Sequence, residues 1–206
     1  MITSFITVKG FSEAEIIEKK SRFIASAAPV SSEEEALLFV EKIKNAQKGA
    51  NHNCYAYRVG LGTVFERRSD DGEPSGTAGS PMLDVLKKEN VTNTVVVVTR
   101  YFGGTLLGAG GLVRAYSSAC AAGIKKSGII TRNLMQNMEL TADYALSGKL
   151  KYEIAERGYE IYDIAYGADV TYKLRVPFEV AEAAREFFVS LASGNILIEK
   201  LEAEFI

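Results

Sequence analysis

A run of four valines that leads into a glycine-rich segment constrains the fold of this chain more than any other feature. Val95 to Val98 have no polar face, which is typical of a strand buried on both sides. The segment from Leu112 to Lys126 is predicted to be a helix, whose small residues allow close packing against a sheet. The stretch from Thr94 to Ala119 therefore predicts a central strand, a glycine-rich loop and a helix that covers the sheet.

The start of this helix is a candidate anion-binding site. The glycines of the loop allow positive φ angles, and the free N–H groups of a helix N-terminus attract negative charge. Arg114 is expected in the first turn of the helix, where a cation opposes the macrodipole unless a negative partner is present. The alternative is that the glycines serve close packing and that Arg114 pairs with a carboxylate. The candidate residues are Arg100, Gly103, Gly104, Gly108, Gly110, Gly111 and Arg114.

The loop matches neither of the common nucleotide-binding motifs. A Walker loop requires Lys followed by Ser or Thr, and this chain has Ala109 and Gly110 at those positions. The dinucleotide fingerprint also fails, because no carboxylate follows about 20 residues further on.

The segment before the valine run is predicted to contain five short strands and two helices. The first helix has an apolar face of Ala36, Leu37, Val40 and Ile43, and the second is expected to begin with Ser80 as N-cap and Pro81 as first residue. The expected strands are residues 5–8, 14–19, 21–28, 52–59 and 63–69.

A polar loop from Asp70 to Ser80 carries three carboxylates. Asp70, Asp71 and Glu73 are weak candidates for a catalytic base or a ligand of a divalent cation. The composition is also that of an ordinary solvated turn, which is the more frequent case. We expect no bound metal and no cofactor, because the chain has a single histidine, His52, and no other ligand pattern.

The last third of the chain has a different pattern. Strands and helices are predicted in the order βαββαβ over about 70 residues, punctuated by glycines at 158, 167 and 194. This order is typical of a ferredoxin-like unit with a four-stranded antiparallel sheet. The sequence thus predicts an α+β protein with two domains, residues 1–130 and 134–206.

Charge is divided unequally along the chain. Residues 1–135 carry 17 Lys and Arg against 13 Asp and Glu, whereas residues 136–206 carry 7 against 13. The first part is therefore suited to meet a polyanion. Cys54 and Cys120 lie in apolar surroundings and are expected to be buried thiols. The chain lacks a signal peptide and a transmembrane run, so we expect a cytoplasmic protein without a membrane partner.

Three blocks of sequence resemble the IMPACT (UPF0029, YigZ-like) family, in its bacterial two-domain form. The blocks are His52 to Arg58, Asp70 to Pro81 and Val96 to Tyr116. The resemblance implies an N-terminal α/β-sandwich domain like those of ribosomal proteins, GHMP kinases and ribonuclease PH. It also implies a C-terminal domain like the ferredoxin-like domain of elongation factor G, and an association with the regulation of translation.

Two functions are compatible with these features. The first is a non-enzymatic protein that binds RNA, the ribosome or a translation factor through the glycine-rich loop and nearby cations and aromatic side chains. The second is an enzyme acting on a nucleotide or a phosphorylated small molecule, with one of the loop carboxylates as base. Hydrolysis by a nucleophile has the least support. The additional binding candidates of the first function are Arg22, Arg58, Tyr101 and Phe102, although the two aromatic residues would also suit a core.

Overall fold

A computed structural model describes residues 1–206 as an α+β protein of two compact units. One unit is residues 5–131, and the other combines residues 1–4 with residues 132–206. No helix in the structure is long and apolar enough to span a lipid bilayer.

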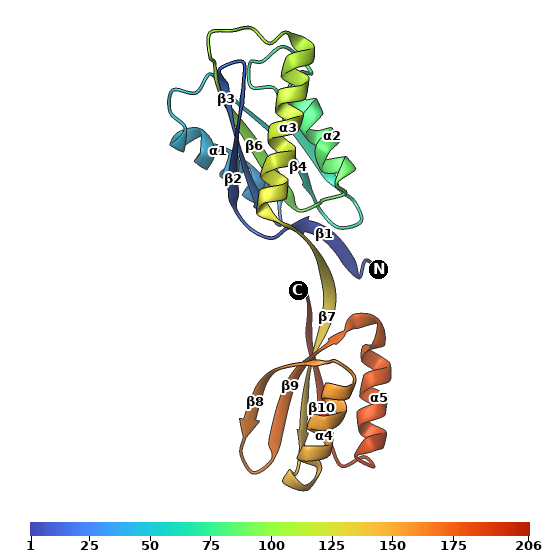
Figure 1. Cartoon of the computed structure of the whole chain (residues 1–206). Coiled ribbons are helices and arrows are strands. Elements are labelled where there is room, and N and C mark those ends of the chain that lie inside the picture. The colour runs from blue at the N-terminus through green and yellow to red at the C-terminus, as the bar shows by residue number, and fades with distance from the viewer. The chain divides into compact units, whose positions relative to one another are not determined.

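The unit of residues 5–131 is built on a five-stranded antiparallel sheet with β6 (Thr94–Tyr101) at its centre (Figure 1). The strand order is β2-β3-β6-β4-β5. Val95 to Val98 have no exposed surface, so the predicted doubly buried strand is confirmed. The other four strands of this sheet are β2 (Ser12–Glu18), β3 (Ser21–Pro29), β4 (His52–Val59) and β5 (Phe65–Ser69). The short strand β1 (Ser4–Val8) is not part of this sheet.

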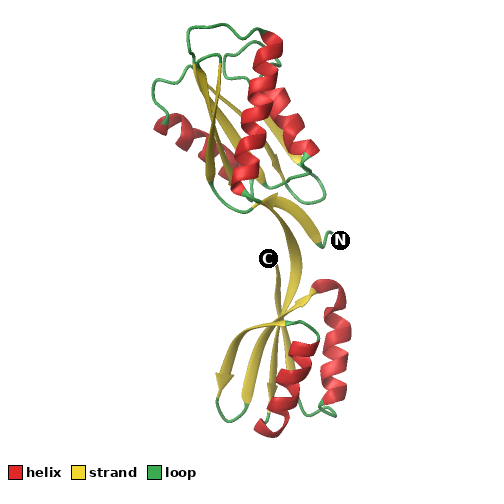
Figure 2. Ribbon diagram, in the orientation of Figure 1, coloured by secondary structure: helices red, strands yellow, loops and turns green.

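Helices cover both faces of this sheet, which explains why the central strand has no polar face. Val96 and Val98 pack in the cluster that contains residues of α2 (Gly79–Lys88) and α3 (Ala109–Ser127). Val95 and Val97 pack in a second cluster with α1 (Glu33–Ala46). Figure 2 shows the long helix α3 lying along the sheet, with the loop that precedes it at one end of the sheet.

Both helices that flank the central strand begin earlier than predicted. α3 begins at Ala109, so Arg114 lies in its second turn and not in the first. α2 begins at Gly79 after Ala78, so Ser80 lies inside the helix and is not its N-cap. At α2 the carboxylate of Asp70 accepts the N–H groups of Ala78 and Gly79, a contact between distant residues that local sequence rules do not detect. At α3 no side chain caps the first turn, and Gly108 with its positive φ precedes the helix.

The second unit contains the elements in the predicted order βαββαβ. β7 pairs with β10 and β9, and β9 pairs with β8, all antiparallel. α4 and α5 contribute Leu150, Ile154 and Phe188 to a single core with the sheet. The elements are β7 (Ile129–Ala142), α4 (Tyr144–Glu156), β8 (Glu160–Tyr166), β9 (Val170–Pro177), a 3-10 turn (Phe178–Val180), α5 (Ala181–Leu191) and β10 (Leu197–Phe205).

Candidate functional site

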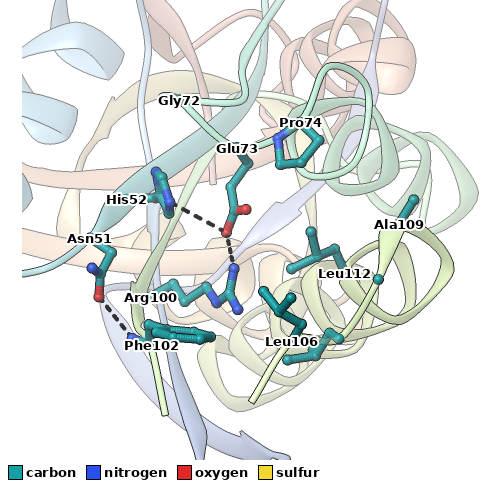
Figure 3. A pocket seen from close by; sticks show the side chains of 12 residues that line it. Asn51, His52, Gly72, Glu73, Pro74, Arg100, Phe102, Leu106, Ala109 and Leu112 are labelled. Atoms are coloured by element: carbon teal, nitrogen blue, oxygen red, sulfur yellow. Dashed lines mark hydrogen bonds and ion pairs between the residues drawn. The ribbon is translucent and has the colours of Figure 1, made fainter. Parts of the chain in front are cut away.

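A pocket of about 440 Å³ opens where β6 ends and α3 begins (Figure 3). Its floor carries charged and polar side chains from β4, from β6 and from the loop between Asp70 and Ala78, which we call the acidic loop. Its walls are mostly apolar. The lining residues are Asn51, His52, Gly72, Glu73, Pro74, Arg100, Phe102, Leu106, Leu107, Gly108, Ala109 and Leu112.

A buried ion pair forms the floor of the pocket. Arg100 Nη1 donates to Glu73 Oε1 at 2.6 Å, and the hydroxyl of Tyr116 donates to the same oxygen at 2.8 Å. The guanidinium of Arg100 lies over the rings of Phe23 and Phe102, with 5.4 and 5.5 Å to the ring centroids. A buried pair is strongly destabilised when one partner is removed, so Glu73 and Arg100 hold each other in place.

His52 faces this ion pair from the neighbouring strand. The register of β4 against β6 places His52 opposite Arg100. Its Nδ1 is 2.9 Å from the carbonyl oxygen of Asp71, and because a carbonyl only accepts, Nδ1 carries the hydrogen. Nε2 therefore presents its lone pair in the neutral ring, 4.0 Å from Glu73 Oε1.

The N-terminus of α3 forms another side of the pocket. Gly108 precedes the helix with φ of 72°, no side chain caps the first turn, and no acidic residue lies in that turn. The N–H groups at the start of a helix have no partner within the helix, so those of residues 109–111 carry partial positive charge without compensation. This end of α3 can receive a negative group from a ligand.

Of the three loop carboxylates, only Glu73 lies in the pocket. Asp71 accepts from Lys44 Nζ and from the backbone N–H of Asn53, away from the pocket lining. Asp70 accepts three backbone N–H groups, from Gly76, Ala78 and Gly79, and so takes the place of an N-cap for α2.

The hydrogen bonds of Asp70 also control its protonation. Burial acts to raise the pKa of Asp70, but the three N–H donors and nearby Arg68 outweigh it and hold the pKa below its ordinary value. Asp70 is thus a fixed anion that orders the loop and not a proton acceptor for catalysis.

The four candidate arginines do not converge on one site. Arg22 binds Glu15 through two hydrogen bonds, and Arg58 binds Glu66 and the carbonyl of Val91. Arg58 lies six positions from His52 along β4, about 20 Å away. Arg100 is the one arginine in the pocket, and Arg114 is exposed and forms no ion pair.

Arg114 instead lines a second hollow of about 260 Å³ beside the glycine-rich loop. Lys19 lies across this hollow, together with the carboxylate-bearing Glu18. Lys19 and Lys20 are both exposed and form the two-residue turn between β2 and β3. We call Lys19, Lys20 and Arg114 the basic rim.

The two candidate aromatic residues have different environments. The hydroxyl of Tyr101 donates to Gln47, and Tyr101 is outside the pocket. Phe102 has 45% of its surface exposed and forms a wall of the pocket, so it is not a core residue.

The glycines have separate roles. Gly103 lies against the turn, since a Cβ atom there would be 2.0 Å from the carbonyl carbon of Lys20. Gly104 and Gly108 have positive φ, whereas Gly110 and Gly111 lie within the first turn of α3.

Sequence reasoning missed Asn51, His52, Lys19 and Lys20 as site residues. A single histidine indicates no site by itself, and the position of His52 opposite Arg100 depends on strand register. Lys19 and Lys20 could have been noticed from the local sequence, because they occupy a two-residue hairpin turn, a position that strongly prefers Asn and Gly.

The thiol and phenol near the ion pair are structural. Burial raises the pKa of Cys54 to about 12, and its Sγ donates to the carbonyl of Asp70. Burial also raises the pKa of Tyr116, with further contributions from Cys54 and Glu73. Both groups stay neutral and act as hydrogen-bond donors. The structure contains no group of three or more His, Cys, Asp or Glu side chains placed to hold a metal ion.

Comparison with known proteins relates the whole chain to one family. Residues 19–124, which include every residue of the pocket, match the Impact N-terminal domain, and residues 140–195 match a domain of unknown function, DUF1949. The chain is 42% identical to IMPACT family member YvyE of Bacillus subtilis over 206 residues, which cover 100% of this chain and 95% of the relative.

Two further comparisons differ in extent. Protein IMPACT homolog of Dictyostelium discoideum is 43% identical over 97 residues, 45% of this chain and 28% of the relative. A crystal structure described as a hypothetical protein has a TM-score of 0.62 and 28% identity, and the match covers 98% of this chain and 99% of the other.

Proposed function

This chain belongs to the IMPACT family, and we propose on that basis that it is a translation-associated regulatory protein that acts by binding RNA of the ribosome. The association with translation is what the resemblance to this family implies. The proposed contact is the basic rim and the adjoining glycine-rich loop on the unit of residues 5–131.

The observation that carries the proposal is a concentration of uncompensated cations at one edge of the loop. Lys19, Lys20 and Arg114 have no carboxylate partner, whereas Arg22, Arg58 and Arg100 each have one. Cations that are free in the protein alone are those available to phosphate oxygens, and release of counterions from RNA would then favour binding.

The conformation of the lysine turn supports a functional role. Lys19 and Lys20 have φ angles of 45° and 68°, in the left-handed region that non-glycine residues avoid. Each such residue costs about 1–2 kcal/mol relative to a residue that suits the turn. Two lysines at strained positions are best explained by the need for charge there.

The glycine-rich loop holds this turn in place. Gly103 packs directly on the backbone of Lys20, and its N–H donates to Ser21 Oγ. The backbone of the turn is thus held against the loop, and its two lysine side chains remain exposed to a polyanion such as folded RNA.

A binding role is favoured over the alternative of an enzyme that acts on a nucleotide or a phosphorylated small molecule. Such an enzyme needs a free carboxylate beside the loop, but Asp70 and Asp71 are hydrogen-bonded elsewhere and Glu73 is compensated by Arg100. The same arrangement that removes the base stabilises the loop, which suits a recognition surface.

The domain folds belong to the same proposal. The three-layer first unit agrees with the ribosomal protein, GHMP kinase and ribonuclease PH type, and the βαββαβ second unit with a ferredoxin-like domain. Both types occur in proteins of the translation apparatus, according to the resemblance described above.

Co-sedimentation with ribosomes across a salt series tests the proposal. Lys19→Asn/Lys20→Gly removes two charges and introduces the residues that the turn prefers, so loss of binding cannot be due to unfolding. When this double substitution is combined with Arg114→Ala, the amount of protein that pellets with ribosomes at low salt should fall at least tenfold. The dependence of pelleting on salt concentration should become shallower.

The matched control is Lys125→Gln/Lys126→Gln at the other end of α3, about 17 Å from Arg114 along the helix axis. These two lysines are also exposed and unpaired, and their removal changes the net charge by two, as Lys19→Asn/Lys20→Gly does without the change at Arg114. Equal losses in both variants would indicate non-specific charge attraction, and no loss in the basic-rim variant would refute the assignment.

A further inference from the structure

We propose that the pocket of about 440 Å³ is a separate site for a small ligand that carries an anionic group at one end and N–H donors at the other. The pocket contains no residue of the basic rim, and its lining shares only Leu107 with that of the second hollow. The inference therefore goes beyond RNA binding and can fail independently of it.

The acceptor end of the site is Glu73. Its Oε1 accepts from Arg100 and Tyr116, but its Oε2 forms no hydrogen bond. Figure 3 shows Glu73 extending from the acidic loop into the pocket above Arg100. Glu73 lines the pocket, so its Oε2 can accept a hydrogen bond from a donor that lies there. An N–H group of a ligand would be such a donor.

The donor end of the site is the start of α3. Ala109 lines the pocket, and the first turn has neither a capping side chain nor an acidic residue. A second observation points to an anion at the same place. Arg100 is 7% exposed and lines the pocket, and its Nε has no hydrogen-bond partner. The uncapped start of α3 leaves positive potential toward the pocket that a phosphate or carboxylate would compensate, and Arg100 adds a guanidinium nitrogen that no group of the chain occupies.

His52 and Asn51 extend the polar floor. His52 lines the pocket, and its Nδ1 is held by the carbonyl of Asp71 while its Nε2 lies 4.0 Å from Glu73 Oε1. The Oδ1 of Asn51 accepts from the N–H of Phe102, which leaves its amide NH₂ as a donor. The site thus combines acceptors and donors, as recognition of a ligand with both kinds of group requires.

The walls indicate the body of the ligand. Leu106 and Phe102 are 82% and 45% exposed although apolar, and Leu107, Leu112 and Pro74 complete an apolar rim. A ring or aliphatic group stacked here would cover this surface, and the volume of about 440 Å³ suits a small molecule. Nucleoside monophosphates and short peptides share this combination of anion, apolar body and N–H donors.

Thermal shift and calorimetric titration distinguish these sources. The probes are the four nucleoside 5′-monophosphates, the corresponding nucleosides without phosphate, inorganic phosphate, and the dipeptides Leu-Leu and Phe-Leu. We expect either the monophosphates or the dipeptides, at 1–5 mM, to raise the melting temperature of the protein. Such a rise corresponds to a dissociation constant of about 1 mM. If no probe binds the wild type, the proposal is overturned.

Two variants locate the binding within the pocket. Ala109→Pro removes one N–H at the first position of α3, where proline is compatible with the helix and with the extended ψ of 166° at Gly108. Ala109→Ser keeps the N–H and is the control. We expect the affinity of Ala109→Pro for the anionic probe to be about tenfold lower than that of the wild type. The affinity of Ala109→Ser should equal that of the wild type.

Glu73→Gln tests the other end, because it replaces the Oε2 acceptor by a donor. We expect Glu73→Gln to lose binding of the probe and to retain its fold, which the near-ultraviolet circular dichroism spectrum checks. If Glu73→Gln is unfolded, the affinity of Ala109→Pro tests the proposal instead. Wild-type affinity in Ala109→Pro would overturn the proposal. Lys19→Asn/Lys20→Gly should bind the probes with wild-type affinity, because neither lysine lines the pocket, and this result separates the inference from the proposed function.

Discussion

At the scale of single residues, the acidic loop shows how similar side chains take different roles. Asp70 orders the loop, Asp71 ties it to β4, and Glu73 is the one that reaches the pocket. Loss of Asp70 leaves three backbone N–H groups without their acceptor, including two at the start of α2. Its energetic role therefore resembles that of an N-cap.

We expect Asp70→Ala to lower the free energy of unfolding by about 1–3 kcal/mol, because a cap and further hydrogen bonds are lost together. Urea denaturation measures this change. Asp84→Ala, at an exposed position on α2, is the control and should change stability by less than about 0.5 kcal/mol. A loss in Asp70→Ala no larger than in the control would contradict the role assigned to Asp70.

The lowered pKa of Asp70 gives this contribution a pH dependence. Because the folded pKa lies below the unfolded one, the contribution is complete above the ordinary pKa of about 3.9 and is lost as the pH falls through the folded value. The difference in stability between wild type and Asp70→Asn should therefore shrink below about pH 4. A difference that stays constant from pH 6 to pH 2 would contradict the charge-based part of this stabilisation.

Both cysteines should be unreactive in the native protein. Burial raises the pKa of Cys54 to about 12 and also raises that of Cys120, so the thiolate fraction near neutral pH is about a thousandfold below that of a free thiol. An aromatic disulfide reagent should label neither thiol of the folded chain and both after denaturation in guanidinium. Rapid labelling of the native protein would show that the acidic loop opens.

At the scale of elements, the glycine-rich loop contains glycines that are required for different reasons. Gly103→Ala places a methyl group against the backbone of Lys20, which neither partner can avoid. Gly104 has φ of 81° but open space around its missing side chain, and Gly110 has neither constraint.

We expect three alanine substitutions to rank accordingly in thermal denaturation. Gly103→Ala should cost about 3 kcal/mol or more, Gly104→Ala about 1 kcal/mol, and Gly110→Ala should stabilise α3 by up to about 1 kcal/mol. Equal effects at the three positions would show that loop flexibility, and not the contact with the β2–β3 turn, is what these glycines provide.

The turn itself provides the opposite case. Lys19→Asn/Lys20→Gly should raise the free energy of unfolding by about 1–2 kcal/mol, because glycine carries no left-handed penalty at position 20 and asparagine carries a smaller one than lysine at position 19. Stability should thus rise while ribosome binding falls, a combination that is expected when a strained conformation serves function. A parallel loss of both would mean that the lysines are structural.

At the scale of the whole molecule, charge and packing are divided between the two units. Residues 5–131 carry 16 Lys and Arg against 13 Asp and Glu, and residues 1–4 with 132–206 carry 8 against 13. The overall charge of −2 therefore conceals a unit suited to a polyanion and one that is not. Each unit also has a core of its own.

Separate cores predict separate responses to core mutation. Leu150 and Leu86 are fully buried in different units, and their replacement by alanine should cost about 2–5 kcal/mol each. Hydrogen exchange should show the loss of protection for Leu150→Ala in residues 132–206 and that for Leu86→Ala in residues 5–131. Spread of either effect through the whole chain would indicate a single cooperative unit.

Short-range patterns in the sequence are sufficient to predict the character of the elements. Four consecutive valines can only be satisfied between two apolar layers, and Val95 to Val98 are buried between α1 and the pair α2 and α3. The alternation of apolar and polar residues, together with the positions of glycines, predicts the βαββαβ order of the second unit. The apolar residues around the two cysteines predict that both thiols are buried. These properties depend on neighbours within a few residues.

Which polar groups contact one another depends on the fold and cannot be predicted from the sequence patterns. Glu73 and Arg100 are 27 positions apart in sequence, and Ser21 is 79 positions from Arg100, yet the strand order β3-β6-β4 brings them together with His52. Four arginines and three carboxylates look alike in sequence, and strand register and loop path select one of each for the pocket. Such contacts arise from long-range pairing of backbone groups, on which periodicity and composition carry no information.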